Sequence, residues 1–353
     1  MTSPPTAARD HTVSEAVEHY LDDVRPVLRR AVLEAVPEQE PFDWLYGPMR
    51  DYPARPSKFL RPALCLATCR AFGGIDDDVL PSAVAIELLH NFFLVQDDIA
   101  DGSELRRGGS TLHTQVGMPL ALTAAGGLGV MAFTQLHANY PRLGSSLGGQ
   151  IGDEFLSMMI RTMTGQATEL GWIRDRVTDL EPHDYLSMVA NKTCWYTTIH
   201  PMRVGGLVGT WGSIDADRFV QFGLHLGAAF QIQDDILNLT GDEATYGKEM
   251  LGDLREGKRT LMLIHLARVA EGADRRTIER YLACDQDARS GDLIQEIRAM
   301  MDRYGSLDYA QAYASRISDD ATTAFEMAFT SAAPGADVDF VAGLIPFMLE
   351  RRR

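Results

Sequence analysis

Apolar residues recur at spacings of three and four along almost the whole chain, from Val13 onward. This is the period of an α-helix with one buried face, and the alternating runs that indicate strands are nearly absent. Glycine and proline fall between the periodic segments, and none of these breaks opens into a long low-complexity linker. The pattern predicts an all-α fold with a single domain at residues 13–353, preceded by a disordered arm at residues 1–12.

The acidity of the chain limits what it can bind. It carries 33 Lys and Arg against 49 Asp and Glu, which gives a formal net charge of -16 at pH 7. A field of this sign repels nucleic acid and anionic membrane surfaces, so an anionic substrate has to meet Lys and Arg gathered in one place. Neither nucleic acid nor a membrane is therefore predicted as a partner.

The compartment and the membrane topology are predicted from two further features. The cysteines lie in helical segments without the paired spacing of a metal site, which is typical of reduced thiols in a cytoplasmic protein. The longest apolar segment, residues 116–133, is interrupted by Pro119 and by glycines, and it falls short of the ~20 clean apolar residues of a membrane span. It is interpreted as a buried helix.

Two nine-residue segments of the chain echo each other. Residues 93–101 read FLVQDDIAD and residues 230–238 read FQIQDDILN, so both contain Phe, Gln, an adjacent Asp pair and Ile in the same places. Each is an apolar helical run that ends in carboxylates. The echo predicts two helices that direct similar acidic ends into one cavity.

The first acidic cluster has the spacing of a metal site. On a helix, Asp97 and Asp101 lie four residues apart on one face, where their oxygens can share a divalent cation such as Mg²⁺. A solvated acidic helix end has the same Asp-Asp-x-x-Asp pattern. However, apolar residues directly precede both clusters, and burying these carboxylates without a metal or cations is very costly.

Basic residues accompany the acidic clusters. Two adjacent arginines just beyond the first cluster are suited to bidentate capture of diphosphate oxygens. Two more cations share a helical face before it, and others lie around residues 192 and 241–259, the latter resembling a mobile lid. Each alone could be a solvated charge or part of a salt bridge, but together with the carboxylates they indicate a metal-bound polyphosphate. These cations are Lys58, Arg61, Arg106, Arg107, Lys192, Lys248 and Lys258.

Residues 58–260 together resemble the trans-isoprenyl diphosphate synthase (polyprenyl synthetase) family, and in pattern most closely its short-chain farnesyl and geranylgeranyl diphosphate synthases. The family's first aspartate-rich motif with its two arginines corresponds to DDIADGSELRRG at residues 97–108, and its second to FQIQDD at residues 230–235. The resemblance implies the class I isoprenoid synthase fold, a helical bundle around a central cavity. It also implies a homodimer.

The resemblance assigns roles to particular residues. Mg²⁺, with three ions per active site, would be bound by Asp97, Asp98, Asp101, Asp234 and Asp235. The allylic diphosphate would be held by Arg106, Lys192, Thr193, Gln231, Lys248 and Lys258. Isopentenyl diphosphate would be held by Lys58, Arg61, His90 and Arg107. The catalytic set implied is Asp97, Asp98, Asp101, Arg106, Lys192 and Asp234.

The chain departs from the family pattern at a few positions. Asn238 replaces the third aspartate of the second motif, Glu169 stands where the family usually has Asp, and Ser57 stands where glycine is common. None of these changes removes an essential charge, but they leave metal affinity and rate open. The expected reaction is ionisation of the allylic diphosphate, attack by the alkene of isopentenyl diphosphate and loss of a proton, most simply to the departing pyrophosphate.

Product length is predicted from the residues before the first motif. At about 100° per residue, Phe93 shares the face of Asp97 one turn away and can floor the cavity, while Phe92 points more sideways. An aromatic pair at this place resembles the arrangement of enzymes that stop at fifteen carbons. Farnesyl diphosphate is therefore predicted, with geranylgeranyl or geranyl diphosphate as the next choices.

Two other functions are compatible with parts of the sequence. A class I terpene cyclase ionises the same diphosphates on the same fold, but it has no use for the second group of cations at Lys58, Arg61, His90 and Arg107. A non-catalytic partner subunit of a heteromeric synthase would have decayed motifs, whereas both aspartate pairs are intact here. The basic end at residues 351–353 is either a solvated tail or a cover for isopentenyl diphosphate, as in some eukaryotic-type farnesyl synthases.

Overall fold

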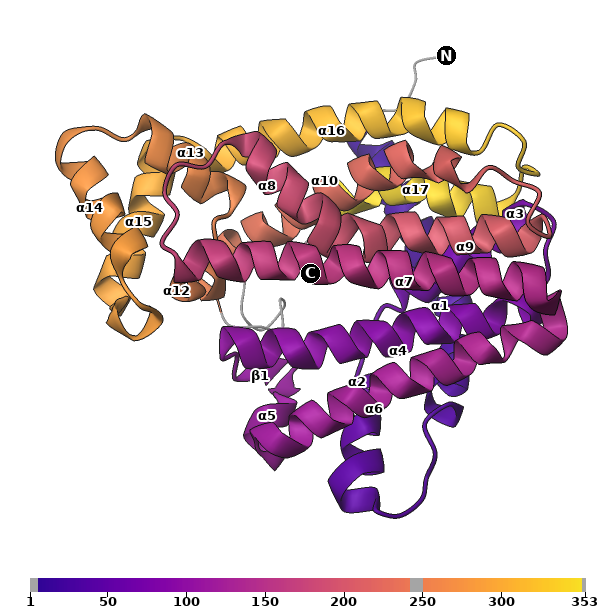
Figure 1. Cartoon of the computed structure of the whole chain (residues 1–353). Helices are drawn as coiled ribbons and strands as arrows, with labels where there is room; N and C mark the ends of the chain where they lie inside the picture. The colour runs from indigo at the N-terminus through magenta and orange to yellow at the C-terminus, as the bar shows by residue number, and fades with distance from the viewer. Residues whose placement is uncertain (1–5, 242–249, 351–353) are drawn as a thin grey trace.

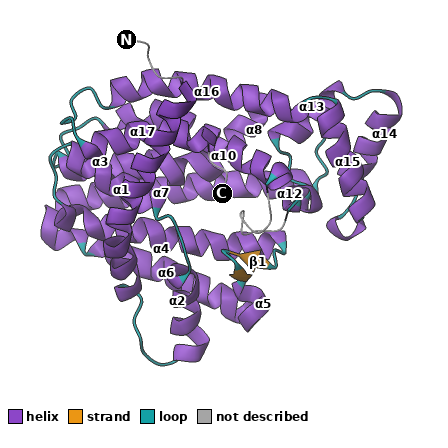
Figure 2. Cartoon of the chain, turned by 180° about the vertical axis from the view of Figure 1, so that it is seen from behind, coloured by secondary structure: helices purple, strands orange, loops and turns teal. Residues whose placement is uncertain are grey.

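The structure is a computed structural model that describes residues 6–241 and 250–350, and these residues are almost entirely helical (Figures 1 and 2). The strands among them, β1 (Leu105–Arg106) and β2 (Gly109–Ser110), form one short antiparallel hairpin. The predicted all-α class is confirmed.

The helices follow one another with short connections. The N-terminal half contains α1 (Thr6–Glu34), the π-helix η1 (Phe42–Tyr46), α2 (Gly47–Ala54), α3 (Leu60–Ala71), α4 (Asp76–Asp101), α5 (Leu112–Val116), α6 (Met118–His137) and α7 (Asn139–Arg174). The C-terminal half contains α8 (Pro182–Val189), the π-helix η2 (Ala190–Ile199), α9 (His200–Gly209), the 3₁₀-helix η3 (Ala216–Phe219), α10 (Val220–Thr240), α12 (Gly252–Glu256), α13 (Leu261–Val269), α14 (Gly272–Ala283), the 3₁₀-helix η4 (Gln286–Ala288), α15 (Gly291–Arg303), α16 (Ser306–Ala328) and α17 (Ala336–Glu350).

Helix α1 corrects the prediction of a disordered arm at residues 1–12. The helix begins at Thr6, so residues 6–12 are helical. Ala7 and Ala8 have the strongest intrinsic helix propensity, and they extend the amphipathic helix that begins in the sequence pattern at Val13. Residues 1–5 of the predicted arm lie outside the described residues.

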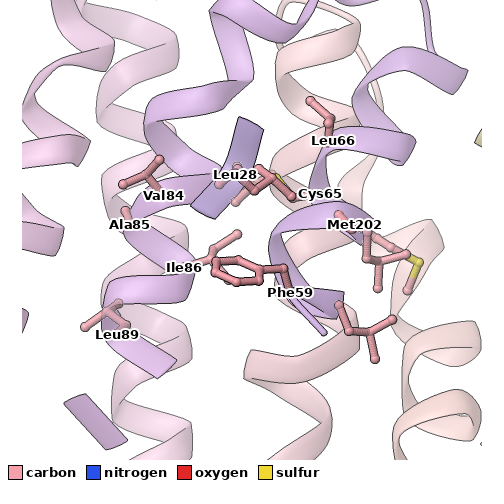
Figure 3. Close-up of a cluster of buried hydrophobic side chains, with 14 of the residues drawn as sticks. Leu28, Phe59, Cys65, Leu66, Val84, Ala85, Ile86, Leu89 and Met202 are labelled. Atoms are coloured by element: carbon pink, nitrogen blue, oxygen red, sulfur yellow. The ribbon is translucent and has the colours of Figure 1, made fainter. Parts of the chain in front are cut away.

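The central helices α4 and α10 carry the two acidic segments that echo each other in the sequence. Helix α4 starts with three acidic residues, which favour the positive end of the helix dipole, and ends at Gly102, whose φ of 69° is the left-handed conformation of a helix C-cap. Most residues of α4 between these ends are buried. Figure 3 shows Ile86 of α4 in a buried cluster with side chains such as Leu28 of α1, Cys65 of α3 and Met202 of α9.

A second apolar cluster lies around α10, α13, α15 and the first half of α16. Helices α10 and α16 contribute to both clusters: Phe222 and Ala321 belong to the first, and Ile232 and Ala310 to the second. The two cores are therefore bridged by the same long helices. This arrangement holds the acidic end of α10 against the rest of the bundle.

The π-helix η2 packs unusually close to its neighbours. A Cβ atom on Gly165 of α7 would lie 2.2 Å from the backbone nitrogen of Lys192, and one on Gly227 of α10 would lie 2.8 Å from the sulfur of Cys194. Only residues without a side chain allow these backbones to approach so closely. A π-helical turn inside an otherwise α-helical segment is also common at functional sites.

Helix α6 corrects the prediction of a buried helix at residues 116–133. Gly117, with a φ of 81°, separates α5 from α6, and one face of α6 is open to solvent, with Val130 59% exposed. By length and composition α4 and α6 could each cross a membrane, but 72% of the apolar stretch of α4 is buried inside the protein and 39% of that of α6. The exposed large apolar side chains of α6 are Met118, Leu122, Val130 and Phe133.

Candidate active site

One large cavity of about 850 Å³ lies between the ends of α4, α7, η2 and α10. It brings together predicted site residues that are up to 200 positions apart in the sequence, from Lys58 to Lys258. Those that line it are Lys58, Arg61, His90, Phe93, Asp97, Arg106, Arg107, Lys192, Thr193, Gln231, Asp234, Asp235 and Lys258. Asp98, Asp101 and Phe92 lie behind this lining, and Lys248 and residues 351–353 are outside the described part of the chain.

The three aspartates of the first segment face different partners. Asp97 accepts hydrogen bonds from Gln166 at 3.2 Å and from Lys192 at 3.4 Å. Asp101 is paired with Lys258, whose Nζ lies 2.7 Å from its Oδ2. Burial, and then the nearby charge of Asp97, raises the pKa of Asp101, while Lys258 opposes this rise.

Asp98 is almost completely buried, with 1% of its surface exposed. It accepts one hydrogen bond from the hydroxyl of Tyr52 at 2.5 Å and another from Nε of Arg106 at 2.8 Å. Burial, followed by the charge of Asp98, raises the pKa of Tyr52, so this hydroxyl remains a donor. Asp98 therefore orients Arg106, which lines the cavity.

The hairpin β1–β2 positions the two arginines, with Arg106 as the last residue of β1 and Arg107 as the first residue of the turn. Arg107, with a φ of 52°, and Gly108, with a φ of 74°, are its two central residues, and positive φ at both positions is the requirement of a type I′ turn. Arg107 is thus held in a conformation that is uncommon for a residue with a side chain. Its guanidinium donates to the side chain of Asn91 at 3.2 Å and to the carbonyl of Tyr52 at 2.9 Å.

The second acidic segment repeats the arrangement on α10. Asp234 and Asp235 both border the cavity, and only 6% of the surface of Asp235 is exposed. The carboxylate of Asp235 accepts hydrogen bonds from Tyr185 and from Nε2 of Gln231, both at 2.7 Å. Burial, and then Asp253, raises the pKa of Asp235.

Asn238, at the position of the missing third aspartate, has a structural contact. Its side-chain oxygen accepts a hydrogen bond from the backbone N–H of Asp253 at 3.1 Å, and its backbone oxygen accepts one from Leu251 at 3.0 Å. These bonds fasten the start of α12, and Lys258 follows the glycine that caps the end of this helix. The substitution thus places a neutral amide where it supports the segment that carries a cation.

Lys192 and Lys258 line the cavity and both lie next to carboxylates. Lys192 contacts both Glu169 of α7 and Asp97, so the residue that departs from the family pattern still supplies a carboxylate here. Thr193 donates to the side-chain oxygen of Gln231 at 2.9 Å. These contacts connect η2 to α7, α4 and α10 at the level of the acidic segments.

A second basic group lies beside the first. Arg61 donates to Tyr196 at 2.9 Å and lies 3.2 Å from Nε2 of His90, and Lys58 lies over the ring of Phe347 in α17. The buried carboxylate of Glu87 lies 3.9 Å from Arg107. Burial raises the pKa of Glu87, and the charges of Arg107 and Arg61 oppose this.

The two phenylalanines before the first motif face in different directions. Phe93 lines the cavity, and its ring lies 5.6 Å from that of Tyr196. Phe92 is buried and points towards α6, where a Cβ on Gly129 would lie 3.7 Å from its ring. Phe93 is therefore at the cavity surface, with Phe92 packed beside it.

Sequence reasoning missed several side chains that complete the site. Glu87 and Gln166 contact predicted residues, but a single carboxylate or amide on a helix carries no distinctive signal. Three further side chains that were missed are tyrosines, which come from elements remote in sequence from both motifs. They are Tyr52 of α2, Tyr185 of α8 and Tyr196 of η2.

The sequence model of the family described as Polyprenyl synthetase matches residues 42–301. The chain belongs to this family. It is 32% identical over 297 residues to a geranylgeranyl diphosphate synthase of Sulfolobus acidocaldarius, an alignment that covers 84% of this chain and 87% of the relative. It is 34% identical over 260 residues to a geranylfarnesyl diphosphate synthase of Aeropyrum pernix, covering 73% and 79% of the two chains.

The polyprenyl synthetase fold is also found in solved structures. The crystal structure of a geranylgeranyl pyrophosphate synthetase from Pyrococcus horikoshii superposes with a TM-score of 0.83 at 28% sequence identity, covering 96% of this chain and 99% of that one. The predicted family, the class I helical bundle and the prenyltransferase activity are thereby confirmed. The chain is a short-chain trans-prenyl diphosphate synthase, while the fifteen-carbon product remains a prediction because the relatives are named for longer products.

Proposed function

We propose that this synthase condenses isopentenyl diphosphate with allylic diphosphates in a magnesium-dependent reaction and that farnesyl diphosphate is its main product. The observation that carries the proposal is the presence of two basic groups around one cavity. Arg106, Lys192 and Lys258 accompany the acidic segments, whereas Arg61 and Arg107 both lie near the buried carboxylate of Glu87. A condensing enzyme needs two such groups because both of its substrates carry a diphosphate.

The carboxylates fit Mg²⁺ that is bound together with a substrate. Among the residues in the described ranges, no three acidic or other ligand side chains converge into a complete metal site. Asp97 and Asp234 nevertheless face the same cavity, and Mg²⁺ is commonly held by one or two carboxylates and completed by phosphate oxygens and water. Of the five aspartates predicted to bind metal, Asp97, Asp101 and Asp234 would hold the ions, which would neutralise charge on the departing diphosphate. The carboxylates of Asp98 and Asp235 are instead engaged by hydrogen bonds from protein side chains.

The other residues of the cavity then have defined tasks. Arg106, Lys192 and Lys258 hold the allylic diphosphate by charge-assisted hydrogen bonds, with Thr193 and Gln231 beside them. Lys58, Arg61, His90 and Arg107 hold isopentenyl diphosphate. The rings of Phe93 and Tyr196 border the space for the allylic chain and keep water from the allylic carbocation. The departing pyrophosphate accepts the proton that the condensation product loses. Lys248 keeps its predicted role.

The product length is proposed from Phe93. Its ring lies where a growing chain would pass along α4, and Phe92 is packed beside it against α6. The support for a fifteen-carbon limit is the size of these rings, since smaller residues would leave room for another isoprene unit. Geranylgeranyl and geranyl diphosphate are the next candidates.

A homodimer through α6 and α7 is proposed as the assembly. The exposed apolar side chains of α6 are continued on α7 by Leu156, Ile160 and Met163, of which Ile160 is 67% exposed. Large apolar side chains exposed in number on two neighbouring helices often mark a protein interface. In a two-fold symmetric dimer, the same surface of a second copy of this chain would cover these side chains. The predicted cytoplasmic location is retained as part of this proposal.

Products identify the function directly. The purified protein is incubated with MgCl₂, isopentenyl diphosphate and, separately, the five-, ten- and fifteen-carbon allylic diphosphates, and the products are identified after dephosphorylation. Farnesol from the five- and ten-carbon starters is the expected result. Longer linear alcohols would correct the chain length, and cyclic hydrocarbons without consumption of isopentenyl diphosphate would indicate a cyclase. Turnover only after a second polypeptide is added would indicate a partner subunit.

A further inference from the structure

The two adjacent aspartate pairs are built in the same way. The first member of each pair, Asp97 or Asp234, lines the cavity. The second member, Asp98 or Asp235, is buried, with 1% and 6% of its surface exposed, although Asp235 still borders the cavity. The sequence echo between residues 93–98 and 230–235 is therefore also an echo in three dimensions.

Asp98 divides its two carboxylate oxygens between two kinds of partner. Oδ1 accepts hydrogen bonds from Arg106, a residue of the cavity lining, with its Nε at 2.8 Å. Oδ2 accepts a hydrogen bond from the hydroxyl of Tyr52 at 2.5 Å. The backbone N–H of Leu112 donates to the same hydroxyl at 3.0 Å. Tyr52 thus joins the end of α4 to the segment that follows the arginine hairpin.

Asp235 divides its oxygens in the same manner. Oδ1 accepts a hydrogen bond at 2.7 Å from Nε2 of Gln231, which also lines the cavity. Oδ2 accepts a hydrogen bond at 2.7 Å from the hydroxyl of Tyr185. Tyr185 belongs to α8, which continues directly into η2 and Lys192. Here too the tyrosine joins an acidic segment to the next element that carries a cation.

We propose that Tyr52 and Tyr185 are a matched pair of positioning residues, each of which fixes the second aspartate of one acidic segment so that Arg106 or Gln231 is presented to the diphosphate. The physical reason is that a carboxylate on a helix can rotate about two bonds. A hydrogen bond to one oxygen fixes the plane of the group and hence the direction of the other oxygen. The inference rests on the proposed function, since it assigns a supporting role for the same substrate site.

Phenylalanine substitutions test the pair because they remove one hydroxyl and keep the ring. In Y52F and Y185F we expect the Mg²⁺ concentration for half-maximal rate and the KM for the allylic diphosphate to rise about 10-fold, as is usual when a residue that orients a metal or anion ligand is lost. The kcat at saturation should change far less. Circular dichroism and thermal unfolding establish that each variant is folded.

Tyr20 offers a matched control. Its hydroxyl donates to Asp337 at 2.5 Å, and neither residue lines the cavity. Y20F therefore removes a hydrogen bond between the same two chemical groups at a place remote from the acidic segments. It should leave both the Mg²⁺ dependence and the KM unchanged.

Binding without turnover provides the second readout. Mn²⁺ is titrated into each protein with inorganic pyrophosphate present, and free Mn²⁺ is followed by electron paramagnetic resonance. We expect about 10-fold weaker binding in Y52F and Y185F than in wild type and Y20F. In a D98N background, Y52F should add no further loss, because Tyr52 acts through Asp98, whereas in a D235N background its loss should add in full.

Two results would overturn the inference. One is Mn²⁺ binding by Y52F and Y185F equal to that of Y20F, and the other is a full additional loss when Y52F is combined with D98N. Failure of the proposed function is recognised separately, because wild-type protein would then consume no isopentenyl diphosphate. The Mn²⁺ and pyrophosphate titrations still decide the role of the tyrosines in that case.

Discussion

The ring of Phe93 meets the ring of Tyr196 edge to face, with their centroids 5.6 Å apart and their planes inclined by 61°. The hydroxyl of Tyr196 also accepts a hydrogen bond from Arg61 at 2.9 Å. The aromatic wall of the cavity is therefore joined to the second basic group. A change in this wall is expected to act on product length first and on isopentenyl diphosphate binding second.

Replacement of Phe93 by alanine should lengthen the product. The substitution removes a ring from the cavity surface and opens space along α4, so we expect products of twenty carbons or more from the ten-carbon starter. Chromatography and mass spectrometry of the dephosphorylated products measure the shift. Phe325→Ala, which removes a ring from an aromatic cluster outside the cavity, is the control. An unchanged product distribution in F93A would contradict the proposed floor.

Replacement of Asp97 by alanine should reduce magnesium-dependent turnover by about 10² to 10³-fold or more, because it removes a carboxylate that faces the cavity and stabilises bound charge. The measurement is the initial rate over a wide range of MgCl₂ concentrations. Asp153→Ala removes an exposed carboxylate of α7 and should retain the wild-type rate. A near-normal rate for D97A would be incompatible with the proposed role.

Replacement of Arg61 by glutamine should affect the KM for one substrate and not the KM for the other. We expect the KM for isopentenyl diphosphate to rise at least about 10-fold, because a charge-assisted hydrogen bond to phosphate is lost. The KM for the allylic diphosphate should stay within about 2-fold, since Arg61 lies with His90 and Tyr196 rather than with the acidic segments. Steady-state kinetics with each substrate varied in turn test this. Equal effects on both values would argue against two separate diphosphate sites.

Acid should destabilise the protein through His200. The imidazole is fully buried against Phe155, neither ring nitrogen has a hydrogen-bond partner in the described part of the chain, and burial lowers its pKa to about 3. Below its ordinary pKa near 6.5 only the unfolded chain takes up this proton, so stability falls as the pH falls from about 6.5 towards 3.

His200→Phe tests this pH dependence. At pH 5 the contribution of His200 amounts to a loss of about 2 kcal/mol in the free energy of unfolding. Denaturant unfolding at pH 5 and pH 7.5 should therefore differ less for H200F than for wild type. His183→Phe, at an exposed position, is the control. An identical pH dependence in wild type and H200F would refute the assignment.

A charge on the exposed face of α7 should dissociate the proposed dimer. Ile160→Glu would bury an unpaired carboxylate at the interface, which is costly. Light scattering after size-exclusion chromatography should show wild type as a dimer and I160E as a monomer. Met327→Glu introduces the same charge on an exposed apolar position of α16 and should remain a dimer. Persistence of the dimer in I160E would exclude this face.

The sequence predicted the helical class and the two acidic segments because both depend on local spacing. Helical periodicity also placed Phe93 on the face of Asp97, as the structure has it. It could not tell that Asp98 turns inward, because the choice of partner is made by Tyr52, which is 46 residues away in the sequence. No pattern in either segment reports such a contact.

Exposure was harder to predict than helix formation. The composition of residues 116–133 indicated burial, yet one face of α6 is open within this chain. Apolar content shows that a surface avoids water but does not say which element or molecule covers it. Residues 6–12 differ from the prediction for another reason: their composition is polar, but their helix propensity is high enough to extend α1.

The contact between Gly165 and Lys192 has a consequence for how the enzyme tolerates change. A methyl group at residue 165 would overlap the backbone of η2, so even alanine would push Lys192 away from Asp97 and Glu169. The position of the Lys192 ammonium group therefore depends on a glycine that carries no polar side chain itself. Among the positions of α7, Gly165 should therefore be one of the least tolerant of substitution, although its side chain is only a hydrogen atom.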